Sequence, residues 1–172
     1  MKRLAILRHA SARSAEPGQS DFDRQLADDG WREARRLGRE IARRGRGFDL
    51  ALASPAVRVR ETLDGIAEGM GELPFPVRFE SAIYDGSPQA MLKLIGSLPA
   101  SAGSALIAGH NPGLHQVAFD LAGDDPAGLR IAIAADFPAA TLALLEFDVD
   151  GWGEVKSGSG ALVGLILPRT LD

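Results

Sequence analysis

Two arginines and two histidines stand where an α/β chain usually carries its functional groups. Arg8 and His9 directly follow the apolar run of residues 4–7. Arg58 comes shortly after the run FDLALA, and His110 directly follows SALIAG. In open, mostly parallel sheets, ligands bind outside the carboxyl ends of the strands. We therefore expect these four side chains to converge on one pocket.

A cluster of these residue types is typical of a phosphate site. Two like charges about 4 Å apart cost roughly 4 kcal/mol at an effective dielectric near 20, and a dianion between them reverses the sign of that cost. The planar fork of Arg also matches phosphate oxygens better than Lys does. The sequence therefore predicts a phosphate pocket lined by Arg8, His9, Arg58 and His110.

Two of the turns also predict helix N-termini beside the pocket. In SPAVR, Ser54 is a good N-cap and Pro55 suits the first helical position, which places Arg58 one turn inside the helix. GHNPG likewise leads from a strand into a helix, where free N–H groups and a compact Gly-Pro-Gly framework bind phosphate oxygens.

His9 is the candidate nucleophile. Neighbouring cations lower the pKa of a histidine, which keeps one imidazole nitrogen free to attack. Covalent catalysis by His splits one difficult step into two easier ones. The alternative for a lone histidine is a structural side chain with satisfied hydrogen bonds, and the convergence of three strand ends favours the nucleophile.

The rest of the chain alternates short apolar runs with longer segments of helical period, as in α/β folds. The runs predict strands over residues 2–8, 48–53, 76–79, 104–109, 140–148 and 161–167. The periodic segments predict helices over residues 29–44, 56–69, 88–97 and 113–122. Residues 11–27 and 123–138 are expected to be loops, and VDGWGEVKSGSG two turns around a short edge segment.

Composition narrows the class of protein. A chain of 172 residues with 45% hydrophobic and 24% charged residues fits one globular domain over residues 1–172. The net charge of −4 argues against binding to nucleic acid. The absence of cysteine fits a reducing compartment, and no apolar run is long enough for a signal peptide or a membrane span. We expect a cytoplasmic monomer with no membrane partner.

Residues 31–47 form a strongly basic segment of helical period. We expect a solvated helix face on which Glu33 and Glu40 pair with arginines, and the alternative is a docking surface for an acidic protein substrate.

The motifs LRHA, SPAVRVRET and GHNP, in this order, resemble the histidine phosphatase superfamily, and more narrowly its short SixA-type phosphohistidine phosphatase branch. DFDRQLADDGWREARRLG also resembles the branch's Asp-x-x-Arg-x-Leu loop and the helix after it. The resemblance implies a three-layer α/β sandwich, phosphoglycerate mutase-like, with a mixed, mostly parallel central sheet flanked by helices. It implies that His9 becomes phosphorylated, that Arg8, Arg58 and His110 complete the phosphate pocket, and that no metal or other cofactor takes part.

The chain departs from the family pattern at the proton donor. Larger members carry a helical insertion with a glutamate general acid, whereas this chain offers only Glu80 and Asp85 there. Asp85 is the candidate acid, and the alternative is a surface turn residue in YDGSP. Gln25 and Ala27 stand where the loop motif has Pro and Thr.

Three further residues are candidates for the rim of the pocket. Asp21 and Arg24 either line the rim or pair with each other at the surface. Asn111 either orients His110 or caps the helix that follows. Thr62, one helical turn after Arg58, either braces that arginine or serves packing.

These residues favour a metal-independent phosphatase whose substrate is a phosphorylated histidine-containing protein and whose product is inorganic phosphate. The P–N bond of phosphohistidine is labile, so its leaving group needs less protonation than an alkoxide does, and positioning and charge supply most of the catalysis. The alternatives are a phosphohistidine-binding module without turnover, and a small-molecule phosphomonoesterase or phosphoglycerate mutase of the same superfamily.

Overall fold

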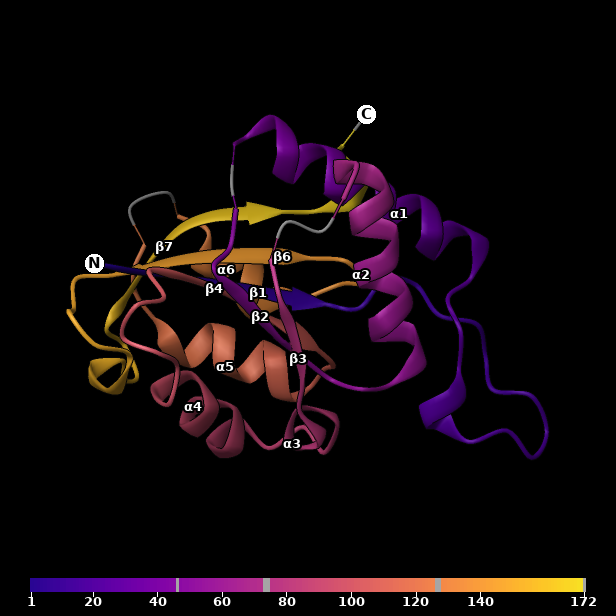
Figure 1. The fold of residues 1–172 in the computed structure, drawn as a ribbon, viewed down its shortest axis with the longest axis horizontal. Coiled ribbons are helices and arrows are strands. Elements are labelled where there is room, and N and C mark those ends of the chain that lie inside the picture. The colour runs from indigo at the N-terminus through magenta and orange to yellow at the C-terminus, as the bar shows by residue number, and fades with distance from the viewer. Residues whose placement is uncertain (46, 73–74, 126–127, 172) are drawn as a thin grey trace.

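The computed structural model describes residues 1–45, 47–72, 75–125 and 128–171, in which a seven-stranded sheet is covered by helices (Figure 1). The strands are β1 (Lys2–Arg8), β2 (Leu50–Ala53), β3 (Val77–Phe79), β4 (Ser104–Gly109), β5 (Ala122–Asp124), β6 (Leu142–Phe147) and β7 (Gly160–Ile166). Their order is β3-β2-β4-β1-β6-β7-β5. Neighbours pair in parallel, except that β6 runs antiparallel to both β1 and β7. The expected mixed, mostly parallel α/β architecture is confirmed.

Strand β1 lies at the centre of the sheet and is buried on both faces. Leu4 and Ile6 pack in the core under α4 (Pro88–Gly96) and α5 (Gly113–Leu121). Ala5 and Leu7 pack on the opposite face, under α1 (Asp28–Arg43) and α2 (Val57–Met70). Figure 1 shows these two helix layers on either side of the sheet. Each large buried aliphatic side chain stabilises the fold by about 1.5–3 kcal/mol, so the residues after β1 start from a well-anchored strand.

Helices α1 and α2 touch each other through a glycine. A Cβ atom on Gly38 would lie 2.3 Å from the main-chain oxygen of Ile66, so no larger residue fits without moving a helix.

The polar face of α1 follows the prediction only in part. Glu40 pairs with Arg43 and Arg44 as expected. Glu33 instead accepts hydrogen bonds from the main-chain N–H and the hydroxyl of Ser11, at 2.8 and 2.9 Å.

The secondary structure departs from the predictions in several places. The expected loop over residues 123–138 contains α6 (Arg130–Ala135), whose start is capped by Asp125 through hydrogen bonds from the N–H groups of residues 129 and 130. The short helix α3 (Ser81–Tyr84) was not predicted. The edge segment expected before β7 is instead a 3-10 turn over Trp152–Glu154, in which the Trp152 side chain is buried in the core.

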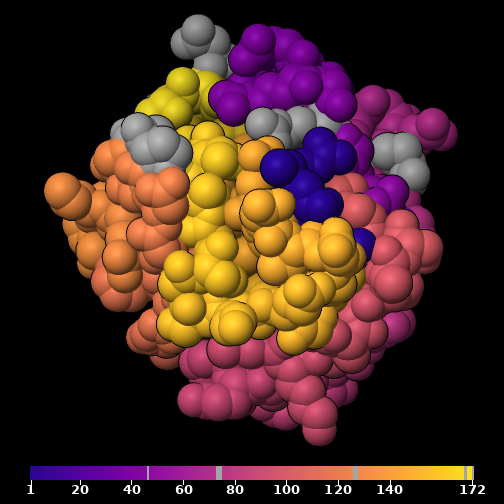
Figure 2. Space-filling model, turned by 90° about the vertical axis from the view of Figure 1, so that its left-hand side faces the viewer, coloured from indigo at the N-terminus to yellow at the C-terminus, as the bar shows by residue number. Residues whose placement is uncertain are grey.

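The N-terminal end of the sheet is closed by side chains. Figure 2 views this end, where the indigo N-terminus lies beside the orange-to-yellow residues that follow β6. The ammonium of Lys2 donates to the main-chain oxygens of Ala100 and Ala102, and the indole N–H of Trp152 also donates to Ala102.

Across the described ranges, no helix is long and apolar enough to span a bilayer.

Candidate functional site

The ends of β1, β2 and β4 lie side by side, as predicted. Arg8 is level with Gly109 across the β1–β4 ladder, and the N–H of His9 donates to the carbonyl of Gly109 at 3.0 Å. The N–H of Ser54 donates to the carbonyl of Ala108 at 2.9 Å. Because these strands are parallel, everything that follows them emerges at one edge of the sheet.

His9 is held in one tautomer by the main chain. Its Nδ1 lies 2.7 Å from the carbonyl oxygen of Ala10. A carbonyl only accepts, so Nδ1 carries the proton and Nε2 keeps its lone pair. Burial lowers the pKa of His9 to about 4, with Arg58, Arg8 and Arg24 acting in the same direction. The imidazole is therefore neutral at neutral pH.

His110 faces His9, with ring centroids 5.2 Å apart. Its Nε2 is hydrogen-bonded to the Ser54 hydroxyl at 2.7 Å, and its Nδ1 is buried without a hydrogen-bond partner among the described residues. Burial lowers the pKa of His110 to about 3, helped by Arg58 and His9. The Ser54 hydroxyl thus bonds to His110, and it also accepts from the main-chain N–H of Ala56 at 3.3 Å. The prediction that Ser54 is the N-cap is wrong, because α2 begins only at Val57 and its N-cap is Ala56.

Arg8 is oriented by the chain segment that leads into β6. Its Nη1 donates to the carbonyl of Phe137 at 2.8 Å, while its Nε is buried without a partner in the described part of the chain. Burial lowers the pKa of Arg8, and the nearby carboxylates of Asp136 and Glu33 oppose that shift. The guanidinium thus keeps donors available beside His9.

Arg58 is oriented by Asp21 in the 3-10 helix η1 (Asp21–Asp23). Its Nη1 donates to the main-chain oxygen of Asp21 at 2.6 Å, and its Nη2 donates to Oδ2 of the same residue at 2.9 Å. The Nε of Arg58 is buried and has no partner among the residues described. Arg24 donates to Oδ1 of Asp21 at 3.0 Å, so the two residues pair with each other, and Asp21 also bonds to Arg58. Arg24 first, then Arg58, lowers the pKa of the Asp21 carboxyl.

Asn111 is tied to the segment that orients Arg8, whereas the Asp85 side chain is exposed. The amide of Asn111 donates to the Phe137 carbonyl at 2.9 Å, the same acceptor that holds Arg8, and it does not cap α5, whose N-cap is Pro112. Asp85 is exposed and makes no side-chain hydrogen bond or ion pair with the described residues. Its neighbour Tyr84 reaches the site instead, through Oδ2 of Asp21 at 3.3 Å and an edge-to-face contact with His110.

Sequence reasoning missed the segment of residues 136–141. The carbonyl of Phe137 accepts from Arg8 and Asn111, and the N–H of Ala140 donates to the carbonyl of His9 at 3.0 Å. Ala140 holds a positive φ of 54°, which is uncommon for a residue with a Cβ. Main-chain groups make these contacts, so the types of the side chains give no signal from which the sequence could predict them.

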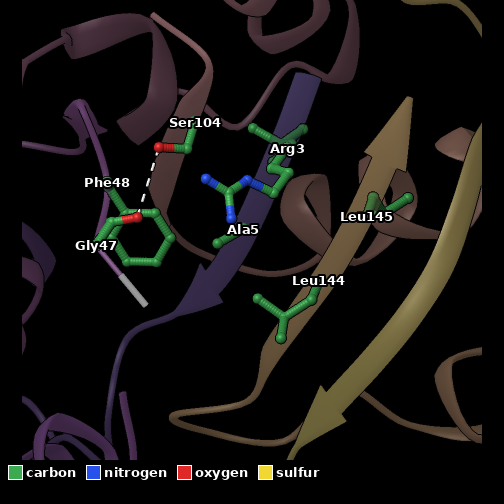
Figure 3. Close-up of a pocket in the computed structure, with 8 residues that line it drawn as sticks. Arg3, Ala5, Gly47, Phe48, Ser104, Leu144 and Leu145 are labelled. Atoms are coloured by element: carbon green, nitrogen blue, oxygen red, sulfur yellow. Dashed lines mark hydrogen bonds between the residues drawn. The ribbon is translucent and has the colours of Figure 1, made fainter. Parts of the chain in front are cut away.

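A small cavity at the other end of β1 is unrelated to this site. Arg3, Phe48 and Leu144 are among its lining residues (Figure 3). Its volume of about 20 Å³ has room for little more than a water molecule. Its lining residues on β1, from Arg3 to Ala5, lie about 13–20 Å from His9 at the rise of an extended strand.

Comparisons with known proteins agree with this geometry. The model of the histidine phosphatase superfamily (branch 1) matches residues 4–83, which include Arg8, His9 and Arg58. The uncharacterized protein Rv1276c of Mycobacterium tuberculosis is 31% identical over 166 residues, which cover 95% of this chain and 100% of that protein. The chain belongs to the histidine phosphatase superfamily.

Solved structures of the superfamily place the chain among SixA-type proteins. A protein assigned as the phosphohistidine phosphatase SixA of Agrobacterium tumefaciens is 28% identical and superposes with a TM-score of 0.82, over 97% of this chain and 98% of that one. Another such assignment, from Nakamurella multipartitia, is 27% identical with a TM-score of 0.83, over 97% and 96% of the two chains. The expected resemblance and the phosphoglycerate mutase-like fold are therefore confirmed.

Proposed function

We propose that this member of the histidine phosphatase superfamily is a metal-independent phosphatase that removes phosphate from phosphohistidine in a carrier or signalling protein. The observation that carries the proposal is a shared arrangement of nitrogen atoms. In Arg8, Arg58 and His110, some side-chain nitrogens are hydrogen-bonded to the protein. One further nitrogen in each, Nε of the two arginines and Nδ1 of the histidine, is buried without a partner among the described residues. The two Nε–H groups are donors, and Nδ1 of His110 is a donor when Nε2 accepts from the Ser54 hydroxyl. Buried donors normally have partners, and a phosphate dianion supplies acceptors for all three.

In the proposed reaction, Nε2 of His9 attacks phosphorus in line with the leaving nitrogen. The substrate's P–N bond breaks, its electron pair stays on the leaving nitrogen, and a new P–N bond forms to His9. Arg8, Arg58 and His110 stabilise the equatorial oxygens, which is where phosphoryl transfer places its charge. Water then attacks phospho-His9, inorganic phosphate leaves, and the electron pair returns to Nε2.

Relatives of this chain support the phosphohistidine substrate, since the two superposed structures described above are assigned as phosphohistidine phosphatases. The labile P–N bond also fits a site in which Asp85, the candidate acid, is exposed and makes no side-chain hydrogen bond or ion pair with the described residues. A phosphate ester would need a proton on its leaving oxygen and would be served less well.

The test is to trap the intermediate. Incubation with a labelled phosphodonor is expected to give an acid-labile, base-stable adduct on His9, and His9→Ala is expected to abolish both the adduct and phosphate release. His115→Gln is the control histidine, because the hydrogen bond of the His115 ring goes to the carbonyl of Ile133 and not to any of the four candidate residues. Full turnover by His9→Ala would overturn the proposal, and binding without release would favour the non-catalytic module.

Turnover rates measured under the same conditions on a phosphohistidine protein and on phosphoglycerate distinguish the two substrate classes. Faster turnover of a phosphohistidine protein than of phosphoglycerate is expected. The reverse ranking would assign the chain to small-molecule phosphoesters.

A further inference from the structure

The Asp21 carboxylate lies on the solvent side of the phosphate-binding arginine. The Arg58 side chain is 6% exposed, whereas that of Asp21, to which it is bonded, is 55% exposed. A substrate phosphate that reaches the buried Nε of Arg58 therefore brings the group attached to it close to Asp21.

Asp21 has room for one more hydrogen-bond donor. A carboxylate offers about four acceptor positions. Oδ2 of Asp21 accepts from Arg58 and from the Tyr84 hydroxyl, and Oδ1 accepts from Arg24. These are the side-chain donors to Asp21 in the described part of the chain, so one position on Oδ1 is open.

Two aromatic rings stand beside this carboxylate. Phe22 and Tyr84 meet edge-to-face with centroids 5.1 Å apart, and Tyr84 meets His110 edge-to-face at 5.6 Å. A planar ring packs well against such surfaces. An acceptor next to aromatic faces favours a flat heterocycle that carries an N–H group.

We infer that Asp21 binds the leaving group, by accepting a hydrogen bond from the free ring N–H of a substrate phosphoimidazolium. The inference deepens the proposed function and rests on it, because it names how the phosphohistidine ring is recognised. Phe22 and Tyr84 form the wall against which that ring packs.

This contact accounts for catalysis without a general acid at the leaving atom. When the distal ring nitrogen is protonated, the breaking P–N bond returns its electron pair to the leaving nitrogen and the ring departs as neutral imidazole. No proton has to be delivered to the leaving nitrogen. Asp21 stabilises the protonated ring through a charge-assisted hydrogen bond and keeps no proton itself.

The charges around Asp21 agree with this role. Arg24 of the same loop, Arg58 of α2, Tyr84 of α3 and the neutral His110 after β4 face it. The two arginines lower the pKa of the Asp21 carboxyl, so it is ionised and ready to accept. A second anionic group on a small phosphate ester would instead meet this carboxylate and be repelled.

The experiment compares substrates with and without the ring. Asp21→Asn keeps an oxygen for Arg58 but removes the charge, and it is assayed on a phosphohistidine peptide and on phosphoramidate, which has a P–N bond but no ring. We expect kcat/KM to fall about tenfold on the peptide, the size of one lost hydrogen bond to a charged group. On phosphoramidate we expect a change of less than about threefold, because Arg58 stays in place.

Asp23→Asn is the matched control, since Asp23 lies in the same 3-10 helix, is exposed and makes no side-chain hydrogen bond or ion pair with the described residues. Equal losses of kcat/KM on both substrates would show that Asp21 only positions Arg58, and would overturn the inference. Unchanged kcat/KM on both substrates would overturn it as well. Failure of the proposed function looks different, because the unaltered protein would then turn over neither P–N substrate through His9.

Discussion

The main-chain N–H of Ala10 donates to the hydroxyl of Thr62 at 3.0 Å. Thr62 in turn donates to the carbonyl of Arg58 at 2.6 Å. The residue directly after the candidate nucleophile is thus tied to the first turn of α2, which carries the candidate phosphate-binding arginine. Thr62 braces the main chain on both sides of the site and not the Arg58 guanidinium.

Thr62→Val is expected to destabilise the protein by about 1–3 kcal/mol, because the buried N–H of Ala10 loses its acceptor at nearly constant side-chain volume. Urea unfolding measures the change. Thr62→Ser keeps the hydroxyl and serves as control, and an equal loss in both variants would assign the effect to packing.

The two buried histidines predict acid destabilisation. The pKa of His110 is about 3 and that of His9 about 4, against 6.5 when unfolded. Between those values the unfolded chain binds more protons than the folded one, so stability falls as the pH is lowered from 6.5. The loss is expected to be on the order of a few kcal/mol at pH 4. His110→Asn should show a weaker slope of unfolding free energy against pH, and an unchanged slope would contradict the prediction.

The same low pKa of His9 predicts where activity is lost in acid. Below about 4 the Nε2 atom is protonated and has no lone pair for attack. After division by the substrate's own ionisation, kcat/KM on an acid-stable aryl phosphate is expected to be flat between about pH 5 and 7. An inflection close to 6.5 would show that His9 titrates like an exposed histidine.

Gly38→Ala is expected to cost about 1–3 kcal/mol, because the added methyl group overpacks the contact between α1 and α2. Its Cβ would lie 2.3 Å from the Ile66 oxygen. Gly47→Ala is the control, since nothing lies within 4 Å of a Cβ there and the residue is exposed. Thermal unfolding compares the two variants, and equal melting temperatures would show that the helices shift at little cost.

Side-chain types and apolar runs were enough to place Arg8, His9, Arg58 and His110 at one edge of the sheet. The reason is physical: a buried strand ends where its apolar run ends, and parallel neighbours bring those ends together. The same signals could not locate the carbonyl of Phe137, which orients Arg8, because a main-chain acceptor has no residue type of its own.

Ser54 shows a different limit. Its type and position predict a helix cap, and its hydroxyl does accept from the N–H of Ala56. Its hydrogen bond to His110 depends on the register of β2 and β4, which the sequence does not show. Likewise α6 is too short for a helical period to be recognised in RIAIAA, and its cap, Asp125, stands several residues away from its first turn.

The position of β1 between β4 and β6 has a consequence for biosynthesis. Its two partners begin much later along the chain, at Ser104 and at Leu142. During synthesis His9 leaves the ribosome long before His110 and Phe137 exist, so the candidate nucleophile waits in a nascent chain that lacks the residues packed around it in the folded protein. Contacts between such distant segments form slowly, and the candidate site is complete only when β4 and β6 have paired with β1.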